Sequence, residues 1–184
     1  SLSGHKIYGP MGIGALFVRR RPRVRLTPLV HGGGQERGFR AGTLPMPLIV
    51  GLGAALALSS ERMEADAMAQ MALRDTLLNR LADRAIPFTL NGRMEGRLPG
   101  NLSLSFPDIP RDVLFAALAD KGVELSSGSA CSSHDVSPSH VLSAMGVEAR
   151  VAQQTLRVGL GRSSTVADID ALLAAIDAAH GKVS

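Results

Sequence analysis

A lysine near the start of the chain has neighbours that suit cofactor chemistry. Lys6 ends the run Ser3-Gly4-His5-Lys6. A lysine amine condenses with an aldehyde to a Schiff base when its pocket keeps part of it unprotonated. Flanking hydroxyl and imidazole groups can donate hydrogen bonds to a phosphate, and glycine lets the backbone come close. The run alone leaves two interpretations open, a cofactor-binding lysine and an ordinary surface lysine.

The second candidate is Cys131, which is the single cysteine of the chain. A chain with one cysteine cannot form an internal disulfide, and this favours a reducing compartment. The residues around it, 126–133, read SSGSACSS and are small and mostly polar. Such a setting gives a thiol access to solvent and freedom to move, which suits nucleophilic attack and transfer. The alternative is an inert buried cysteine. His134, three residues on, can either assist thiolate formation or simply face water.

A third candidate is Arg157, inside the short apolar segment Thr155-Leu156-Arg157-Val158-Gly159. An arginine in a strand of this kind needs a partner, and a carboxylate is the natural one. The partner can be a structural Asp or Glu or the carboxylate of a substrate, and the segment does not decide between them.

Composition limits the classes of protein that need to be considered. Hydrophobic residues make up 45% and charged residues 20% of the 184 residues, which is typical of a soluble globular chain. Five arginines lie within 19–25 and suit either an acidic partner or a plain solvated face. Because no stacking aromatics are interleaved with them, we expect no nucleic-acid binding. The apolar stretch 44–58 is shorter than the ~20 residues of a membrane span, and the first residues do not have the pattern of a signal peptide. We therefore predict a cytoplasmic protein with no membrane association.

The elements that position these residues follow from local patterns. Glycines and prolines predict turns in residues 1–18, with a short buried strand at 15–18. Two consecutive helices are expected, at 47–59 and, from a 3.6-residue period, at 60–84. The remaining predictions are strands at 88–90, 101–106, 123–125 and within 153–159, and helices from 108 or 110 to 120, from 137–138, and over 165–180 with Ser164 or Thr165 as its cap. The pattern predicts an α/β fold with a boundary near residue 60.

Four motifs occur together in one order: SGHKIYGPMGIG at 3–14, HGGGQERGFRAGT at 31–43, SSGSAC at 126–131 and LRVGLGR at 156–162. Together they resemble the cysteine desulfurases of the group I, or NifS/IscS-like, branch, for which the SSGSAC loop is specific. The resemblance covers nearly the whole chain and implies a fold-type-I transferase dependent on pyridoxal phosphate. Residues 1–60 then correspond to the C-terminal part of the large cofactor-binding domain. Residues 61–184 correspond to the small α/β domain that carries the cysteine loop.

The resemblance also implies roles for residues of the cofactor site. Lys6 matches the lysine that binds pyridoxal 5'-phosphate covalently, and Ser3 and His5 match ligands of its phosphate. Thr43 matches a threonine that reaches the phosphate held by the neighbouring subunit, so a homodimer is expected. No metal site is expected.

The implied reaction is that of a cysteine desulfurase, a sulfurtransferase that converts L-cysteine to L-alanine. Arg157 matches the arginine that binds the substrate carboxylate. Cys131 matches the catalytic cysteine, which takes the sulfur as a persulfide and passes it to acceptors such as iron–sulfur cluster scaffolds or tRNA thiolation proteins.

Two alternatives stay open. Another fold-type-I enzyme, such as an aminotransferase or a selenocysteine lyase, shares the lysine but gives no reason for the SSGSAC loop. A non-catalytic fragment acting only as a folded domain is the other. The family's N-terminal portion, with the histidine that stacks on the cofactor ring and the aspartate at its nitrogen, has no counterpart in this sequence. We therefore expect little or no turnover by this chain alone.

Overall fold

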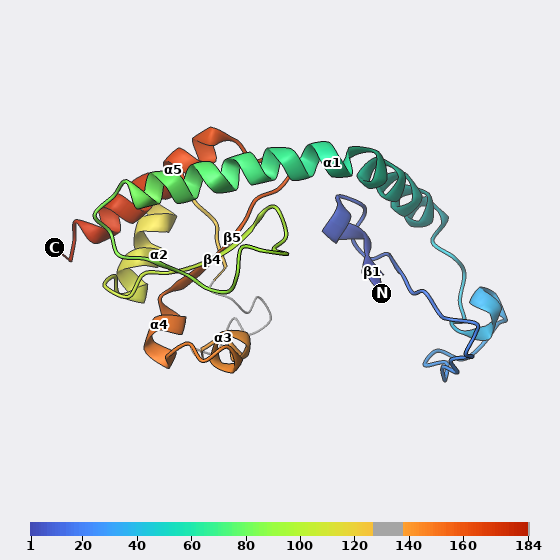
Figure 1. Cartoon of the computed structure of the whole chain (residues 1–184). Coiled ribbons are helices and arrows are strands. Elements are labelled where there is room, and N and C mark those ends of the chain that lie inside the picture. The colour runs from blue at the N-terminus through green and yellow to red at the C-terminus, as the bar shows by residue number, and fades with distance from the viewer. Residues whose placement is uncertain (127–137, 184) are drawn as a thin grey trace. The chain divides into compact units, whose positions relative to one another are not determined.

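The computed structural model describes residues 1–126 and 138–183. The chain divides into two compact units, Ser1–Met63 and Glu64–Ser184, and each is described by itself. The elements, labelled in Figure 1, are β1 (Leu2–Ser3), the short helix η1 (Gly4–Ile7), β2 (Gly14–Ala15), η2 (Gln35–Gly38), α1 (Met46–Ala82), β3 (Thr89–Leu90), β4 (Asn101–Ser105), α2 (Arg111–Asp120), α3 (His140–Ala144), α4 (Ala149–Gln153), β5 (Thr155–Gly159) and α5 (Val166–His180).

Helix α1 is one continuous helix, so the prediction of two helices at 47–59 and 60–84 is wrong. It begins beside two prolines, and the amides of Leu48 and Ile49 donate to the Pro45 carbonyl, as suits a proline-rich first turn. The junction expected near Ser59 and Ser60 carries neither proline nor glycine, so nothing interrupts the backbone hydrogen bonds. The change from an apolar to a charged pattern there does not mark a helix end. It marks the boundary between the two units that the helix runs through.

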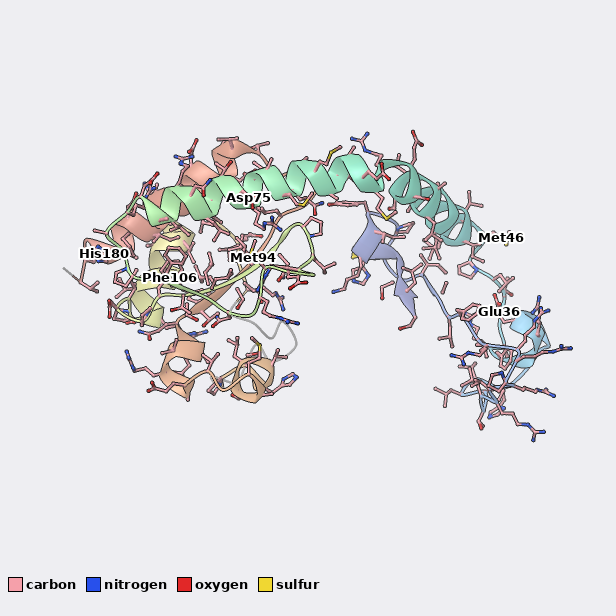
Figure 2. All side chains as sticks on the ribbon, viewed as in Figure 1. Glu36, Met46, Asp75, Met94, Phe106 and His180 are labelled. Atoms are coloured by element: carbon pink, nitrogen blue, oxygen red, sulfur yellow. The ribbon has the colours of Figure 1, made fainter. Side chains whose placement is uncertain are left out.

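The second unit contains a three-stranded antiparallel sheet with β4 in its middle. Leu102, Leu104 and Leu156 alternate with polar residues and are fully buried. They pack with apolar residues of the C-terminal half of α1, of α2 and of α5, and Figure 1 shows these three helices on the same side of the sheet. Phe106, labelled in Figure 2, lies in this core with no exposed surface. The predicted α/β fold is confirmed, with one face of the sheet left to polar residues.

Local predictions for this unit differ in outcome. The strands expected at 101–106 and 153–159 are confirmed as β4 and β5. The helix expected at 165–180 is confirmed as α5, and its cap is Thr165, whose amide and hydroxyl both lie within 3 Å of Asp168 Oδ2. The strand expected at 123–125 is wrong, because only an isolated bridge at Ser126 forms there. The start expected at Ser137 lies outside the described residues, and α4 was not predicted.

In the first unit, the expected buried strand at 15–18 is wrong. Strand β2 ends at Ala15, and Phe17 is 85% exposed. An apolar run is buried only where another layer covers it, and the β1–β2 ladder pairs just two residues on each side. No described helix is both long enough and apolar enough to cross a membrane.

Candidate active site

Lys6 stands on a short turn that backbone hydrogen bonds close at both ends. The Gly4 amide donates to the Ile13 carbonyl at 2.8 Å, and the Gly9 amide donates to the Gly4 carbonyl at 2.9 Å. Gly4 is buried, and a Cβ there would lie 2.8 Å from the Pro10 carbonyl oxygen, so only glycine fits. Within the turn the Lys6 and His5 side chains are exposed. The sequence therefore folds locally so that a lysine and an imidazole project from a tightly closed loop.

A line of small residues on α1 lets this turn approach the helix closely. Gly51, Ala55 and Ser59 are four residues apart and so lie on one helix face. A Cβ on Gly51 would come within 2.6 Å of the Pro10 ring, and one on Gly9 within 3.0 Å of the Ala55 methyl. The Ser59 hydroxyl donates to the Ile7 carbonyl at 3.5 Å. The helix thus positions the turn that carries Lys6.

Thr43 follows a glycine-rich loop of the same unit. The Gly42 amide donates to Gln35 Oε1 at 3.2 Å, and Arg40 donates from Nη1 to the Gly42 carbonyl at 3.1 Å. Glu36 and Arg37 have φ values of 50° and 56°, which is the left-handed region that such residues seldom adopt. Thr43 itself is exposed, and no contact joins it to the Lys6 turn among the described interactions.

The arginine run of the first unit lines a hollow of about 650 Å³. Arg19, Arg20 and Arg23 form part of its wall, together with Phe17 and Phe39. All five side chains are exposed. The run is therefore a solvated basic surface with an apolar component.

Arg157 lies in β5 on the face of the sheet opposite the core. Its neighbours Leu156 and Val158 are buried, whereas Arg157 is exposed because side chains alternate along a strand. It stands between two serines. Ser103 of β4 is its Cα partner on one side, and on the other side the Arg157 amide donates to the Ser126 carbonyl at 2.9 Å. The pairing joins the strand of Arg157 to the residue that begins the SSGSAC motif.

Buried polar groups fix the strands beside Arg157. The hydroxyls of Ser105 and Thr155 are 2.7 Å apart, and Asn91 Nδ2 donates to Ser105 Oγ at 2.8 Å and to Ser103 Oγ at 3.2 Å. Ser105, Thr155 and Asn91 are all buried. A satisfied buried network of this kind holds one register, because any slip leaves its groups unpaired. The network thereby sets the position of Ser103 opposite Arg157.

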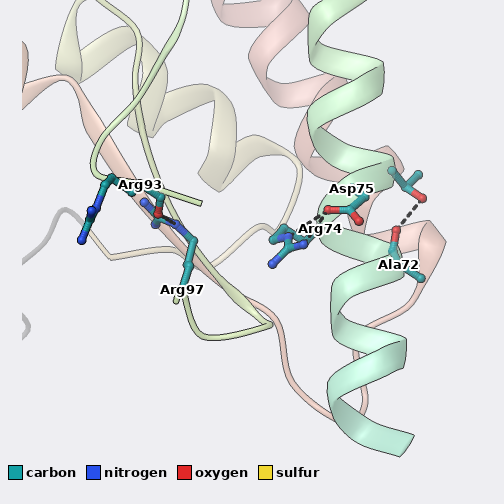
Figure 3. A network of polar contacts seen from close by, with 6 residues as sticks. Ala72, Arg74, Asp75, Arg93 and Arg97 are labelled. Carbon is teal, nitrogen blue, oxygen red and sulfur yellow. Dashed lines mark hydrogen bonds and ion pairs between the residues drawn. The ribbon is translucent and has the colours of Figure 1, made fainter. Parts of the chain in front are cut away.

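A positioning residue closes the loop that leads into β4. Arg97 donates from Nε to the Arg93 carbonyl at 3.0 Å, as Figure 3 shows, and from Nη1 to Asn101 Oδ1 at 3.3 Å. Beyond β5, Arg162 pairs with Asp66 of α1 at 2.7 Å, and both side chains are largely buried. The strand of Arg157 is thus tied at its far end to the long helix.

A hollow of about 340 Å³ opens beside Arg157. Arg157, Ser126, Gly159, Leu125 and Glu124 line it. The sequence motifs included Arg157 and Ser126 but missed Glu124. The alternation of polar and apolar residues over 123–126 is the signal that indicates which way Glu124 points.

The remaining predicted residue, Cys131, lies outside the described residues. Ser3, His5 and Lys6 come together in one turn of the first unit, while Arg157 belongs to the second unit. Among the described residues no cluster of three metal-ligating side chains occurs.

Known proteins resemble the chain in sequence and in fold. Residues 1–172 match the aminotransferase class-V family model. The cysteine desulfurase IscS of Rickettsia typhi is 49% identical over 170 residues, which are 92% of this chain and 41% of that protein. The chain therefore spans about two fifths of the length of the curated relatives it matches.

Solved structures agree with these matches. The X-ray structure of a NifS-like protein from Rickettsia africae has a TM-score of 0.84 and 28% identity, covering 97% of this chain and 46% of that one. The structure of SspA in complex with cysteine has a TM-score of 0.63 and 35% identity, covering 89% and 44%. Fold and matches together define the fold-type-I class to which this chain's fold belongs. The chain belongs to the aminotransferase class-V family, and its predicted resemblance to NifS/IscS-like cysteine desulfurases is confirmed.

Proposed function

We propose that this chain supplies the cofactor lysine, the substrate-binding arginine and the sulfur-accepting cysteine of a cysteine desulfurase. The observation that carries the proposal is the hydrogen bond from the Arg157 amide to the Ser126 carbonyl. It sets the proposed carboxylate site against a residue five positions before Cys131. Five residues span at most roughly 17 Å, so the thiol stays within reach of a substrate held at Arg157.

The residues around Lys6 fit pyridoxal 5'-phosphate. Ser3, His5 and Lys6 lie within four successive residues. The Ser3 hydroxyl and the His5 imidazole offer hydrogen-bond donors for a phosphate, and the Lys6 side chain, as the neutral amine, can condense with an aldehyde. When bound, the cofactor supplies an electron sink for the substrate's Cα. The Lys6 amine then takes the proton from Cα and later returns a proton. Thr43 extends this proposal to a homodimer, in which it reaches the phosphate of the neighbouring subunit.

The proposed substrate is L-cysteine, which is also the ligand named for the SspA structure. Arg157 binds its carboxylate with paired N–H donors and so orients the reacting bonds. The Cys131 thiolate attacks the substrate sulfur, and the bond from that sulfur to Cβ breaks. The electron pair of the broken bond stays with the carbon fragment, which takes up protons and leaves as L-alanine. The sulfur remains as a persulfide on Cys131.

The persulfide needs an acceptor protein, and the chain offers a basic surface for one. Arg19, Arg20 and Arg23 are exposed and line the larger hollow together with Phe17. Acidic iron–sulfur scaffold or thiolation proteins suit this surface through charge complementarity. Binding there would weaken as ionic strength rises.

Mass spectrometry of the enzyme containing this chain tests the proposal. After incubation with L-cysteine and pyridoxal phosphate, we expect L-alanine and the mass of one added sulfur on Cys131. Cys131→Ser should abolish the persulfide, and Lys6→Ala should abolish both products together with the cofactor's visible absorbance. Lys121→Ala is the matched control, since Lys121 is an exposed lysine at the end of α2. Turnover that yields a keto acid and no persulfide would replace the proposal with an aminotransferase.

A further inference from the structure

The hollow beside Arg157 contains an acidic side chain that the desulfurase motifs do not include. Its volume of about 340 Å³ is at the small end of ligand pockets and suits a molecule the size of an amino acid. Arg157 supplies a cation, Ser126 a hydroxyl and Glu124 a carboxylate to its wall. All three residues, with Leu125 and Gly159, belong to the described part of the chain.

Glu124 points to the same side as Arg157. Val123 and Leu125 pack against the core, so the alternate residues Glu124 and Ser126 face the other way. Ser126 forms an antiparallel bridge with Arg157. Glu124 lies two residues before Ser126 and lines the same hollow as Arg157. Because both side chains are long and belong to the wall of one small hollow, they can hold opposite ends of one small molecule.

Gly159 leaves this space open. Gly159 lines the same hollow as Glu124 and Arg157. A Cβ built on Gly159 would meet no atom within 4 Å. Gly159 therefore adds no side chain to the hollow, and the Arg157 guanidinium and the Glu124 carboxylate both belong to its wall.

We propose that Glu124 is a specificity-determining residue that binds the α-ammonium group of an amino acid whose carboxylate is held by Arg157. The inference rests on the proposed function for the role of Arg157. It adds that the hollow selects the zwitterion before the amine reacts at the cofactor. A ligand with only a carboxylate pairs with Arg157 but is repelled by the negative charge of Glu124. An amino acid zwitterion pairs with Arg157 through its carboxylate and with Glu124 through its ammonium group. With two unit charges a few ångström apart near a protein surface, the discrimination should be roughly tenfold.

Binding of two small ligands by the 184-residue chain tests this without any cofactor. L-alanine and propionate share a carbon skeleton and a carboxylate, but only alanine has an amine. Titration is followed by the backbone amide resonances of Ser126, Arg157 and Gly159 in the ¹⁵N-labelled chain. We expect wild-type protein to bind alanine roughly tenfold more tightly than propionate. Glu124→Gln should bring the two affinities to within about twofold of each other, because it removes both the attraction and the repulsion.

Control variants separate this effect from net charge and from the function itself. Glu95→Gln removes another exposed carboxylate, from a different loop, and should leave the ratio of the two affinities unchanged. Arg157→Gln should weaken both ligands. An unchanged ratio in Glu124→Gln, or equal affinities or no binding in the wild-type chain, overturns the role of Glu124. Failure of the proposed function would show differently, as an enzyme that discriminates the ligands yet forms no persulfide on Cys131.

Discussion

The two compact units differ in how far their apolar side chains are buried. In the second unit, Leu102, Leu104 and Leu156 have no exposed surface and belong to one core built from the sheet, α1, α2 and α5. In the first unit, Phe17 is 85% and Leu29 93% exposed. The buried apolar residues described there are few and mostly small: Ala41, Leu52 and Ala55.

The difference bears on the proposed substrate-binding arginine and the proposed cofactor lysine. Arg157 lies on a strand whose other face is part of a continuous core, so burial of that core holds the strand in place. Lys6 lies on a turn whose support is a few close contacts to one helix. Exposed apolar side chains in one region are typical of a surface that another chain covers, which fits the proposed acceptor protein at Phe17 and a second subunit elsewhere in this unit. The proposed substrate-binding arginine is thus held by the core of its own unit, whereas the proposed cofactor lysine has only a few close contacts to support its turn.

Hydrogen exchange should show the largest difference between the units. Amides of β4, β5 and α5 should exchange on the order of 10³-fold more slowly than those of Gly4 and Gly9 in the Lys6 turn, relative to intrinsic rates. The reason is that opening the core exposes far more apolar surface than opening a two-residue ladder. Measurement by NMR or mass spectrometry on the intact chain suffices. Similar protection of the amides from exchange in both units would contradict the proposed difference in how firmly the two units are packed.

Truncating one large side chain in each unit gives the next largest effect. Leu104→Ala should destabilise the chain by about 2–5 kcal/mol, because it leaves a cavity in a fully buried site. Phe17→Ala should change the free energy of unfolding by about 0.5 kcal/mol or less, since its ring is exposed. Urea unfolding followed by circular dichroism measures both. A Phe17 effect as large as that of Leu104 would show that the first unit buries this ring.

Sequence patterns predicted the helices and strands that are determined by residues close together in the sequence. The period-two alternation at 101–106 predicts β4, and Ser164 or Thr165 as a cap predicts the start of α5, for which the structure has Thr165. The continuity of α1 was missed, because a change of polarity resembles a helix end although no residue there breaks a helix. The exposure of residues 15–18 was missed for a related reason, since an apolar run does not reveal whether a second layer covers it.

In the candidate site, too, local sequence patterns do not reveal which distant segments come into contact. Motif spacing predicts Lys6, Cys131 and Arg157 individually, and a resemblance supplies their roles. That Ser126 pairs with Arg157 is a contact between segments about thirty residues apart, which no local pattern encodes. Glu124 acquires its place in the hollow only through that pairing. Non-local strand pairing is therefore what the structure adds to the sequence.

The ion pair between Arg162 and Asp66 should contribute to the free energy of unfolding by an amount between those of the Leu104 and Phe17 side chains. Asp66→Asn should cost about 2 kcal/mol, because Asp66 and Arg162 are only 15% and 22% exposed, so both charges of the pair are largely removed from water. Asp75→Asn is the matched control, and it breaks the pair with Arg74 shown in Figure 3. The Arg74 side chain is also buried, at 11% exposure, but Asp75 is 55% exposed, so about 0.5 kcal/mol or less is expected. Thermal unfolding of both variants gives the comparison. Equal costs would mean that burial does not strengthen the Arg162 pair.

Two glycines of α1 give the smallest and sharpest test of how the Lys6 turn is supported. A Cβ on Gly53 would meet nothing within 4 Å, so Gly53→Ala should stabilise the helix by about 1 kcal/mol through helix propensity alone. Gly51→Ala gains the same propensity, but its Cβ would come within 2.6 Å of the Pro10 ring. We expect a net loss of about 1 kcal/mol, because the turn must move away from the helix. Thermal unfolding gives the sign, and the amide resonances of Gly4 and Gly9 report whether the turn has shifted. If Gly51→Ala stabilises the chain as much as Gly53→Ala and leaves those resonances in place, the small-residue face of α1 does not position Lys6.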